Sequence, residues 1–306
     1  MLTLDQAGAV LGLVRPGAAA TEVIARTGGQ LSTVYEVRCT GSPVIVKVYA
    51  EQWRLAKEVH VYGVLGDHGV GPVPTILHAS PGTELIGSAF TVMTRLAGRP
   101  LSEVIGSLTV DEVRAVYRQL GAALSAVHRV PQDAYGYLTT HVLEPVPDNT
   151  AYMTRQFARK LREFAERGGD PVLHDGARAY VAERVALFAR CVAPRLCHND
   201  LHESNVLVTR ASGRWTMTGF IDVENAVAAD PLLDLAKTDS YAIRGDEAKM
   251  SGLVDGYGPL PGDWADRLRL YRLYHALELW DWFASIGEVS PLPGIADDIR
   301  TLTARP

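Results

Sequence analysis

The sequence changes its hydrophobic pattern at residues 94–100. Before this segment, short runs rich in β-branched and aromatic residues predict strands, accompanied by two stretches of helical periodicity. The expected strands are 21–27, 33–38, 44–49, 75–78 and 89–94, and the expected helices are 2–14 and 51–66. After it, helical periodicity dominates. The pattern predicts an α+β fold of two lobes, a small β-rich lobe over residues 1–95 and a larger helical lobe over residues 96–306.

One β-hairpin interrupts the helical part. Its expected strands are 206–209 and 215–221, joined by the turn Ala211-Ser212-Gly213. The expected helices around it are 109–129, 149–168, 174–191, 232–241, 247–257 and 262–285. Because the two open ends of a hairpin meet, polar residues that flank its strands are expected to lie close together.

The composition of the 306 residues excludes several classes of protein. Hydrophobic residues make up 47% and charged residues 21%, which are ordinary values for a globular chain. No apolar run reaches the roughly 18 residues of a membrane-spanning helix, so no membrane partner is expected. The 30 basic against 35 acidic side chains lack the basic excess of a nucleic-acid binder. Residues 196–306 hold 17 of the acids and 10 of the basic residues, which favours cations as ligands.

The cysteines and the amino terminus indicate a cytoplasmic protein. There are three cysteines, an odd number, and no pair of them is spaced as C-x-x-C. Thiols in a reducing compartment are therefore expected rather than disulfides. The first residues, Met1-Leu2-Thr3-Leu4-Asp5, carry no basic region of the kind that begins a signal peptide.

The segment His198-Asn199-Asp200-Leu201-His202-Glu203-Ser204-Asn205 precedes the hairpin, and Ile221-Asp222 closes it. Three oxygen-bearing side chains, those of Asp200, Asn205 and Asp222, thus meet at the hairpin's open end, which suits Mg²⁺. The spacing matches the catalytic loop and metal-binding aspartate of kinases. A metal hydrolase with His198 and His202 as ligands is disfavoured, because that motif needs a helix and a glutamate after the first histidine.

These residues resemble the aminoglycoside phosphotransferase and choline kinase branch of the protein-kinase-like fold, as do Ile221-Asp222-Val223-Glu224-Asn225 and Asp230-Pro231-Leu232-Leu233-Asp234-Leu235-Ala236. The resemblance implies that Asp200 is the catalytic base and that Asn205 and Asp222 bind Mg²⁺. It also implies structural roles: His198 braces the catalytic loop, and Asp234 steadies it from a helix start.

The small lobe offers an independent indication. Lys47, one of only five lysines, lies inside the apolar run Val44–Tyr49, where an ammonium group needs a partner. Glu58 follows on the next helix and is within reach of it, as in the kinase pair that holds the α- and β-phosphates. An edge strand with a solvated Lys47 and a surface pair of Lys57 with Glu58 are the alternatives.

Two further segments are expected to bind ATP or GTP. The loop 28–33, with Gly29, Ser32 and Thr33, would cover the phosphates through backbone N–H groups. The link 90–96 would bind the base through its backbone. In the link, Met93 stands at the gatekeeper position, followed by Thr94 and Leu96.

The acceptor is expected to be a small molecule with a hydroxyl group, because Ile221-Asp222-Val223 replaces Asp-Phe-Gly and no Ala-Pro-Glu follows. The candidate acceptor-binding residues are His202, Glu203, Asp239, Glu278 and Asp281. An antibiotic such as an aminoglycoside is the favoured acceptor, which would make the protein a resistance enzyme. A metabolic kinase of choline, a sugar or an amino alcohol, a kinase of a nucleoside antibiotic, and a nucleotide-binding pseudokinase remain as alternatives.

Overall fold

The computed structural model describes residues 1–26 and 32–304. The chain folds into two compact units. The sheet unit comprises Met1–Gly106, Leu138–His141 and Ser204–Glu224, and the helical unit comprises Ser107–Tyr137, Val142–Glu203 and Asn225–Pro306. The chain therefore passes from the helical to the sheet unit inside the predicted catalytic loop, between Glu203 and Ser204.

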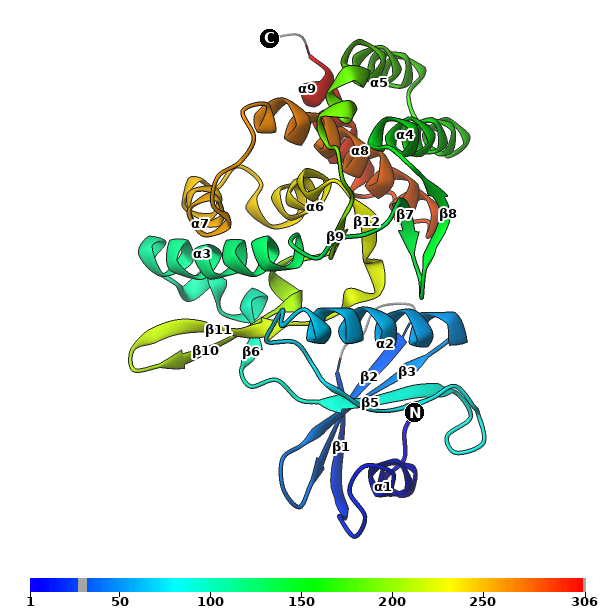
Figure 1. The fold of residues 1–306 in the computed structure, drawn as a ribbon, viewed down its shortest axis with the longest axis vertical. Coiled ribbons are helices and arrows are strands. Elements are labelled where there is room, and N and C mark those ends of the chain that lie inside the picture. The colour runs from blue at the N-terminus through cyan, green and yellow to red at the C-terminus, as the bar shows by residue number, and fades with distance from the viewer. Residues whose placement is uncertain (27–31, 305–306) are drawn as a thin grey trace. The chain divides into compact units, whose positions relative to one another are not determined.

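An antiparallel five-stranded sheet is the centre of the sheet unit (Figure 1). Its strands are β1 (Ala20–Arg26), β2 (Ser32–Cys39), β3 (Val44–Tyr49), β4 (Ile76–Ser80) and β5 (Ala89–Thr94). Their order is β1-β2-β3-β5-β4, so β3 lies in the middle of the sheet. A central β3 excludes the alternative of an edge strand for Lys47.

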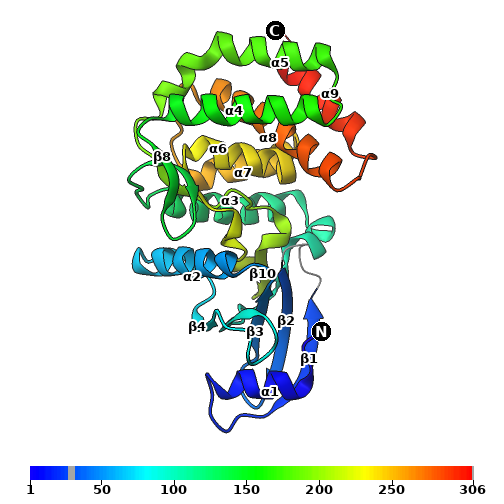
Figure 2. The same ribbon diagram turned by 90° about the vertical axis from the view of Figure 1, so that its right-hand side faces the viewer.

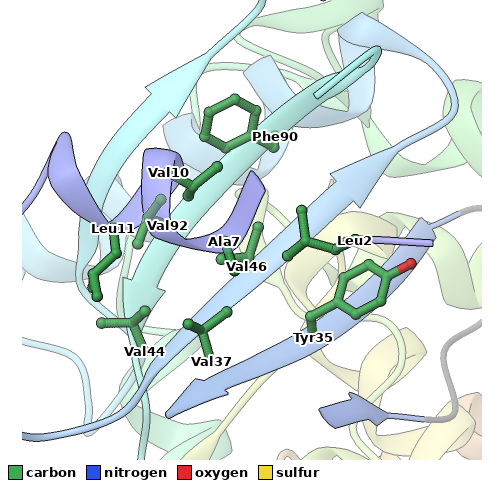
Figure 3. Packing of buried hydrophobic residues seen from close by; sticks show 10 residues of the cluster. All are labelled: Leu2, Ala7, Val10, Leu11, Tyr35, Val37, Val44, Val46, Phe90 and Val92. Atoms are coloured by element: carbon green, nitrogen blue, oxygen red, sulfur yellow. The ribbon is translucent and has the colours of Figure 1, made fainter. Parts of the chain in front are cut away.

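Strand alternation separates the two faces of this sheet. One face buries Val44 and Val46 of β3 with Val92 of β5 against the helix α1 (Leu4–Gly12), which contributes Val10 and Leu11 (Figure 3). The other face packs on α2 (Gln52–Asp67), where Tyr49, Leu55 and Ala89 form a smaller apolar cluster. Lys47 projects from this second face, where it contacts Glu58 of α2.

The hairpin of β10 (Val206–Ala211) and β11 (Arg214–Phe220) belongs to the sheet unit, where β10 also pairs with the short strand β6 (Arg99–Pro100). Val206 pairs with Phe220 at its open end. Gly219 has a φ of +146°, and a Cβ there would strike the carbonyl oxygen of Pro72. Glycine thus lets the hairpin lie close to the chain that follows α2.

Seven α-helices and a small sheet form the described part of the helical unit (Figure 2). The helices are α3 (Val110–Val127), α4 (Asn149–Glu166), α5 (Pro171–Arg184), α6 (Pro231–Thr238), α7 (Glu247–Tyr257), α8 (Trp264–Ser285) and α9 (Leu292–Thr303). The sheet has the order β8-β7-β12-β9, from β7 (Tyr135–Leu138), β8 (Val142–Val146), β9 (Arg195–Cys197) and β12 (Val227–Ala229). Helix α3 packs along α7, and α8 packs against α4, α6 and α9.

The two-lobed α+β fold expected from the sequence is confirmed, and most predicted elements lie within two residues of their expected ends. Two predicted helices end earlier than expected. Helix α5 ends at Arg184 and continues as the 3₁₀ segment Val185–Arg190, and α6 gives way after Thr238 to the π-helical turn Asp239–Ile243. Strands β7, β8 and β12 were not predicted, because strands of three to five residues carry too little periodicity. Helix α9 was not predicted either.

None of the helices within residues 1–26 and 32–304 combines the length and the apolar character needed to cross a membrane.

Glycines set the contact between α3 and α7. A Cβ on Gly121 of α3 would strike the carbonyl oxygen of Leu253 in α7. In the reverse direction, a Cβ on Gly252 or Gly256 would strike the backbone of α3. The two helix backbones therefore touch directly, with no side chain between them at these points.

One added methyl group at this contact should destabilise the protein. We expect Gly256→Ala to lower the free energy of unfolding by about 1–3 kcal/mol, because the two backbones must separate. Gly63→Ala in α2 is the matched control, since a Cβ there meets nothing within 4 Å. Gly63→Ala should raise the free energy of unfolding by about 0.5–1 kcal/mol. Equal melting temperatures of both variants by circular dichroism would contradict this account.

Candidate active site

Lys47 is the centre of a buried charge cluster in the sheet unit. Its ammonium nitrogen lies 2.8 Å from Glu58 Oε2 and 3.0 Å from Asp222 Oδ1. Glu224 Oε2 is 3.5 Å away. Burial alone would lower the pKa of Lys47, but the three carboxylates outweigh it and hold the pKa well above its ordinary value. Lys47 therefore stays charged, and it joins β3, α2 and the end of the hairpin.

The neighbours of Glu58 hold it in place. The Tyr49 hydroxyl donates to Glu58 Oε2 at 2.8 Å and lies 3.0 Å from Thr91 Oγ1. Glu58 and the adjacent Lys57 are both buried, so the alternative of a surface pair between them is wrong. Burial lowers the pKa of Lys57 to about 7, an effect that Glu224 partly offsets.

The hairpin brings the two predicted metal ligands together within the sheet unit. The N–H of Ile221 donates to the carbonyl oxygen of Asn205 at 2.9 Å, and the next residue is Asp222. Asp222 has a left-handed φ of +68°, and its N–H donates to the Tyr62 hydroxyl at 3.1 Å. A carboxylate and an amide at one hairpin end are oxygen donors of the type that Mg²⁺ prefers, so these residues fit that ion.

Asp234 anchors the start of the predicted catalytic loop in the helical unit. Its carboxylate accepts hydrogen bonds from the backbone N–H of His198 at 2.6 Å and of Asn199 at 3.0 Å. The ring of His128 contributes a third contact, 3.1 Å from Nε2 to Asp234 Oδ2. Burial alone would raise the pKa of Asp234, but the contacts with His128 and the loop outweigh it and lower the pKa.

Asp200 follows this anchor and is oriented within the same unit. The Asn225 amide donates to Asp200 Oδ2 at 3.0 Å, and His202 Nε2 lies 3.8 Å from Asp200 Oδ1. Thr238, at the end of α6, donates from its hydroxyl to the carbonyl oxygen of Leu201 at 2.9 Å. The loop between β9 and β10 contains no α-helix, so His198 and His202 lack the helical spacing of a metal hydrolase.

The acidic residues expected to bind the acceptor all contact cationic side chains of the helical unit. Glu203 accepts from the Tyr117 hydroxyl and from Lys249, both at 2.7 Å. Asp239 lies 3.4 Å from Arg272, a contact that only partly offsets the rise in its pKa caused by burial.

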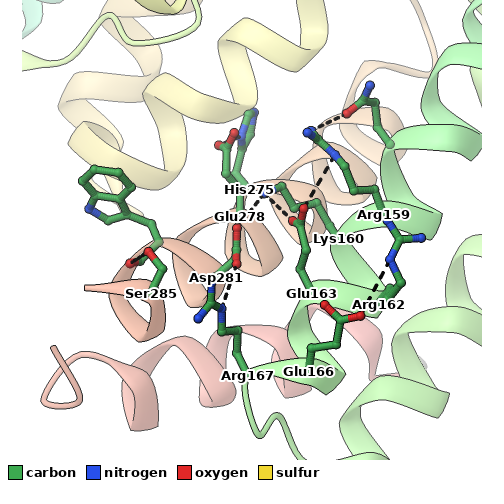
Figure 4. A network of polar contacts seen from close by, with 12 residues as sticks. Arg159, Lys160, Arg162, Glu163, Glu166, Arg167, His275, Glu278, Asp281 and Ser285 are labelled. Atoms are coloured by element: carbon green, nitrogen blue, oxygen red, sulfur yellow. Dashed lines mark hydrogen bonds and ion pairs between the residues drawn. The ribbon is translucent and has the colours of Figure 1, made fainter. Parts of the chain in front are cut away.

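The two acids on α8 are paired in the same way. Glu278 lies 2.7 Å from Lys237 and 3.1 Å from His275 Nδ1. Asp281 lies 3.0 Å from Lys160 of α4 and 3.6 Å from Arg167, the residue that follows α4 (Figure 4). Burial alone would raise the pKa of Glu278, but Lys237 and His275 outweigh it and hold the pKa far below its ordinary value.

The segments expected to bind the nucleotide are partly described. Met93 is buried in β5 opposite Ile45 of β3, on the face from which Lys47 projects. The N–H of Thr94 donates to the carbonyl oxygen of Thr75 at 2.9 Å, and Leu96 follows the end of β5. Ser32 and Thr33 begin β2, paired with Tyr49 and Val48, whereas Gly29 lies outside the described residues.

Several residues of the site were missed from the sequence. Glu224 beside Lys47, and Asn225 beside Asp200, were read only as parts of the motif segment. His128, which lies far away in sequence, gave no signal. Lys237 gave a usable one, because it is one of five lysines and stands in an apolar helix.

His128, Cys197 and Asp234 form a buried group whose spacing would admit a metal ion. Both ring nitrogens of His128 already have partners, since Nδ1 lies 2.8 Å from the Tyr257 hydroxyl and Nε2 contacts Asp234. The group is therefore a structural network, joined to the predicted catalytic loop through Asp234.

The two-lobed α+β fold is that of the protein-kinase-like class. The sequence model of the phosphotransferase enzyme family matches residues 22–271. The chain belongs to this family. The prediction of an enzyme that phosphorylates an alcohol group is confirmed at the level of the family.

Solved structures share the fold at low sequence identity. A thermostable variant of aminoglycoside phosphotransferase APH(4)-Ia in its apo form is 17% identical and covers 98% of each chain with a TM-score of 0.75. The GDP complex of aminoglycoside 2'-phosphotransferase-IIIa is 14% identical, covers 96% of each chain and has a TM-score of 0.68.

A curated relative, the probable acyl-CoA dehydrogenase IBR3 of Arabidopsis thaliana, is 25% identical over 190 residues. The match covers 59% of this chain and 22% of that protein, so the chain spans only about a fifth of its length.

The anchor at Asp234 predicts a defined dependence of stability on pH. Because its folded-state pKa lies below the ordinary 3.8, its contribution is present above that value and is lost as the pH falls through the folded-state pKa. We expect Asp234→Asn to reduce the free energy of unfolding by about 3–5 kcal/mol at pH 7. The difference from the wild type should stay constant down to about pH 5 and narrow below about pH 4.

Urea unfolding at several pH values measures this difference. The control is Asp255→Asn, which removes an exposed carboxylate 3.0 Å from Arg114 and should change stability little. An equal effect of the two substitutions at neutral pH would refute the anchoring role of Asp234.

Proposed function

We propose that the protein transfers the γ-phosphate of a nucleoside triphosphate, bound with Mg²⁺, to a hydroxyl group of a small molecule. The buried Lys47 ammonium, which joins Glu58 of α2 to Asp222 at the hairpin end, carries this proposal. An ammonium held by a helix glutamate and the metal-binding aspartate is the arrangement with which kinases hold nucleotide phosphates. The division of labour follows, with residues 1–95 binding the nucleotide and residues 96–306 supplying the catalytic loop and the acceptor site.

Asp200 would act as the base for the acceptor. Its carboxylate accepts the proton of the attacking hydroxyl, and the amide of Asn225 keeps one carboxylate oxygen in a fixed orientation. Asp234 and His198 hold the loop in position. Asn205 and Asp222 would bind Mg²⁺, which neutralises phosphate charge when it is bound. Positioning and charge neutralisation thus supply most of the catalysis.

The nucleotide would lie on the Lys47 face of the sheet. Met93, Thr94 and Leu96 would contact the base, while Gly29, Ser32 and Thr33 would cover the phosphates. Either ATP or GTP is compatible with this arrangement. Structural neighbours were solved with ADP and hygromycin B, with AMP-PNP and hygromycin B, and with GDP.

An aminoglycoside antibiotic is the first acceptor to test, because the neighbours with hygromycin B share this fold. A resistance role would follow if it is phosphorylated. The second candidate is a metabolic kinase of an uncharged acceptor such as a sugar, which the ion pairs of Glu203, Asp239, Glu278 and Asp281 favour. A nucleotide-binding pseudokinase is disfavoured because Lys47, Glu58, Asp200, Asn205 and Asp222 are all present.

Removal of the base should separate turnover from nucleotide binding. We expect Asp200→Asn to lower kcat by about 10²–10⁴-fold, because the hydroxyl proton loses its acceptor. The nucleotide dissociation constant should stay within twofold of the wild type. Turnover is followed by coupled ADP or GDP release and binding by calorimetry. Undiminished turnover in this variant would overturn the assignment of Asp200.

The ion pair of Lys47 should determine nucleotide affinity. We expect Glu58→Gln to weaken binding of ATP or GTP by about tenfold or more, because Lys47 loses its partner on α2. Glu51→Gln is the matched control, since Glu51 stands at the start of the same helix and pairs with Arg54 at 2.8 Å near the surface. Equal nucleotide affinities in the two variants would contradict the proposal, provided that circular dichroism shows both folded.

A further inference from the structure

The lysine at the end of α6 lies next to the catalytic loop. Thr238 donates to the carbonyl oxygen of Leu201, the residue after the catalytic Asp200, at 2.9 Å. Lys237 directly precedes Thr238, and the Asp200 carboxylate contributes to the raised pKa of its ammonium. Any acceptor whose hydroxyl reaches Asp200 therefore meets the field of a buried cation.

Lys237 is part of a fixed set of polar groups. Its nitrogen lies 2.7 Å from Glu278 Oε2 and 4.8 Å from the centre of the Tyr241 ring. His275 holds the same Glu278 oxygen at 3.1 Å from Nδ1, while its Nε2 lies 2.8 Å from the carbonyl oxygen of Leu233. The set thus offers N–H and O–H donors next to a carboxylate acceptor, with its charges balanced inside the protein.

Balanced charges of this kind disfavour a polycationic acceptor. A cationic amine gains less from a carboxylate that a lysine already neutralises, because the ammonium of the lysine repels the amine. The same applies to Glu203 with Lys249 and to Asp239 with Arg272. Hydroxyl groups both donate and accept, so they can bind to such a set without breaking its ion pair.

We propose that Lys237, Tyr241 and Glu278 form the acceptor-binding surface beside Asp200, and that it selects an uncharged polyhydroxylated acceptor such as a sugar over a polycationic one. This inference rests on the proposed kinase function and specifies its acceptor. Lys237 is the specificity-determining residue, because its ammonium both repels amines and neutralises Glu278.

Titration with hygromycin B tests the exclusion of polycations whether or not the natural acceptor is known. Calorimetry at low salt should give a dissociation constant above ~1 mM for the wild type. Lys237→Met should bind hygromycin B about tenfold more tightly, because Glu278 loses its neutralising partner. Lys160→Met is the matched control, since it removes the same charge at the contact of α4 and α8, where Asp281 keeps Arg167 as a cationic partner. It should leave the dissociation constant unchanged. Micromolar binding to the wild type that Lys237→Met does not strengthen would overturn the proposal.

A set of sugars matched in all but charge tests the selection directly. We would incubate the enzyme, Mg²⁺ and nucleotide with glucose, glucosamine and glucuronate, and then with larger polyols, amino sugars and sugar acids. Mass spectrometry detects an added phosphate. We expect transfer to the uncharged members, reduced in Lys237→Met and retained in Lys160→Met. Preference for an amino sugar or a sugar acid over its uncharged counterpart would refute the proposed selectivity. If none is phosphorylated, the hygromycin B titration decides.

The two proposals fail in different ways. If the wild type shows no Mg²⁺-dependent nucleotide hydrolysis, the kinase function itself is contradicted. Retained hydrolysis together with preferred transfer to amines would contradict only the acceptor inference.

Discussion

The structure depends on the burial of one ammonium group. Lys47 stands in the central strand β3, and an unpaired cation there would be strongly unfavourable. Glu58, Asp222 and Glu224 remove that penalty, and they come from α2 and from the hairpin end. The position of α2 on the sheet and the course of the chain after β11 are therefore both tied to the same atom. A phosphate group that approaches Lys47 meets a cation already oriented by the fold.

The sequence predicted those features that depend on short-range patterns. Strand β3 and the hairpin were expected because a run of β-branched and aromatic residues and a Gly-containing turn are local signals. The contact of Lys47 with Glu58 was expected because a charged residue in an apolar run needs a partner, and it is present at 2.8 Å. The roles of both residues in nucleotide binding stay predictions.

Other features depend on contacts that no local pattern contains. His128 supports Asp234 from a distance of 106 residues in sequence, so its role appears only when the chain is folded. The acids on α8 could be recognised from the sequence, but their pairing with Lys160 of α4 and Lys237 of α6 could not. From the sequence, the acidic surplus of residues 196–306 indicates Mg²⁺ first and leaves a cationic acceptor to the remaining acids. The structure shows that part of it is neutralised internally.

The direct contact of α3 with α7 has a consequence for the chemistry. Tyr117 of α3 and Lys249 of α7 both hold Glu203, three residues after Asp200 in the catalytic loop. Glycines set the spacing of these two helices, and this spacing also determines where Tyr117 and Lys249 hold Glu203. A methyl group added at this helix contact would shift Tyr117 and Lys249 together. The spacing of the two helices thus determines the position of the loop. Selection for reaction rate would then act on glycines, which contribute only by lacking a side chain.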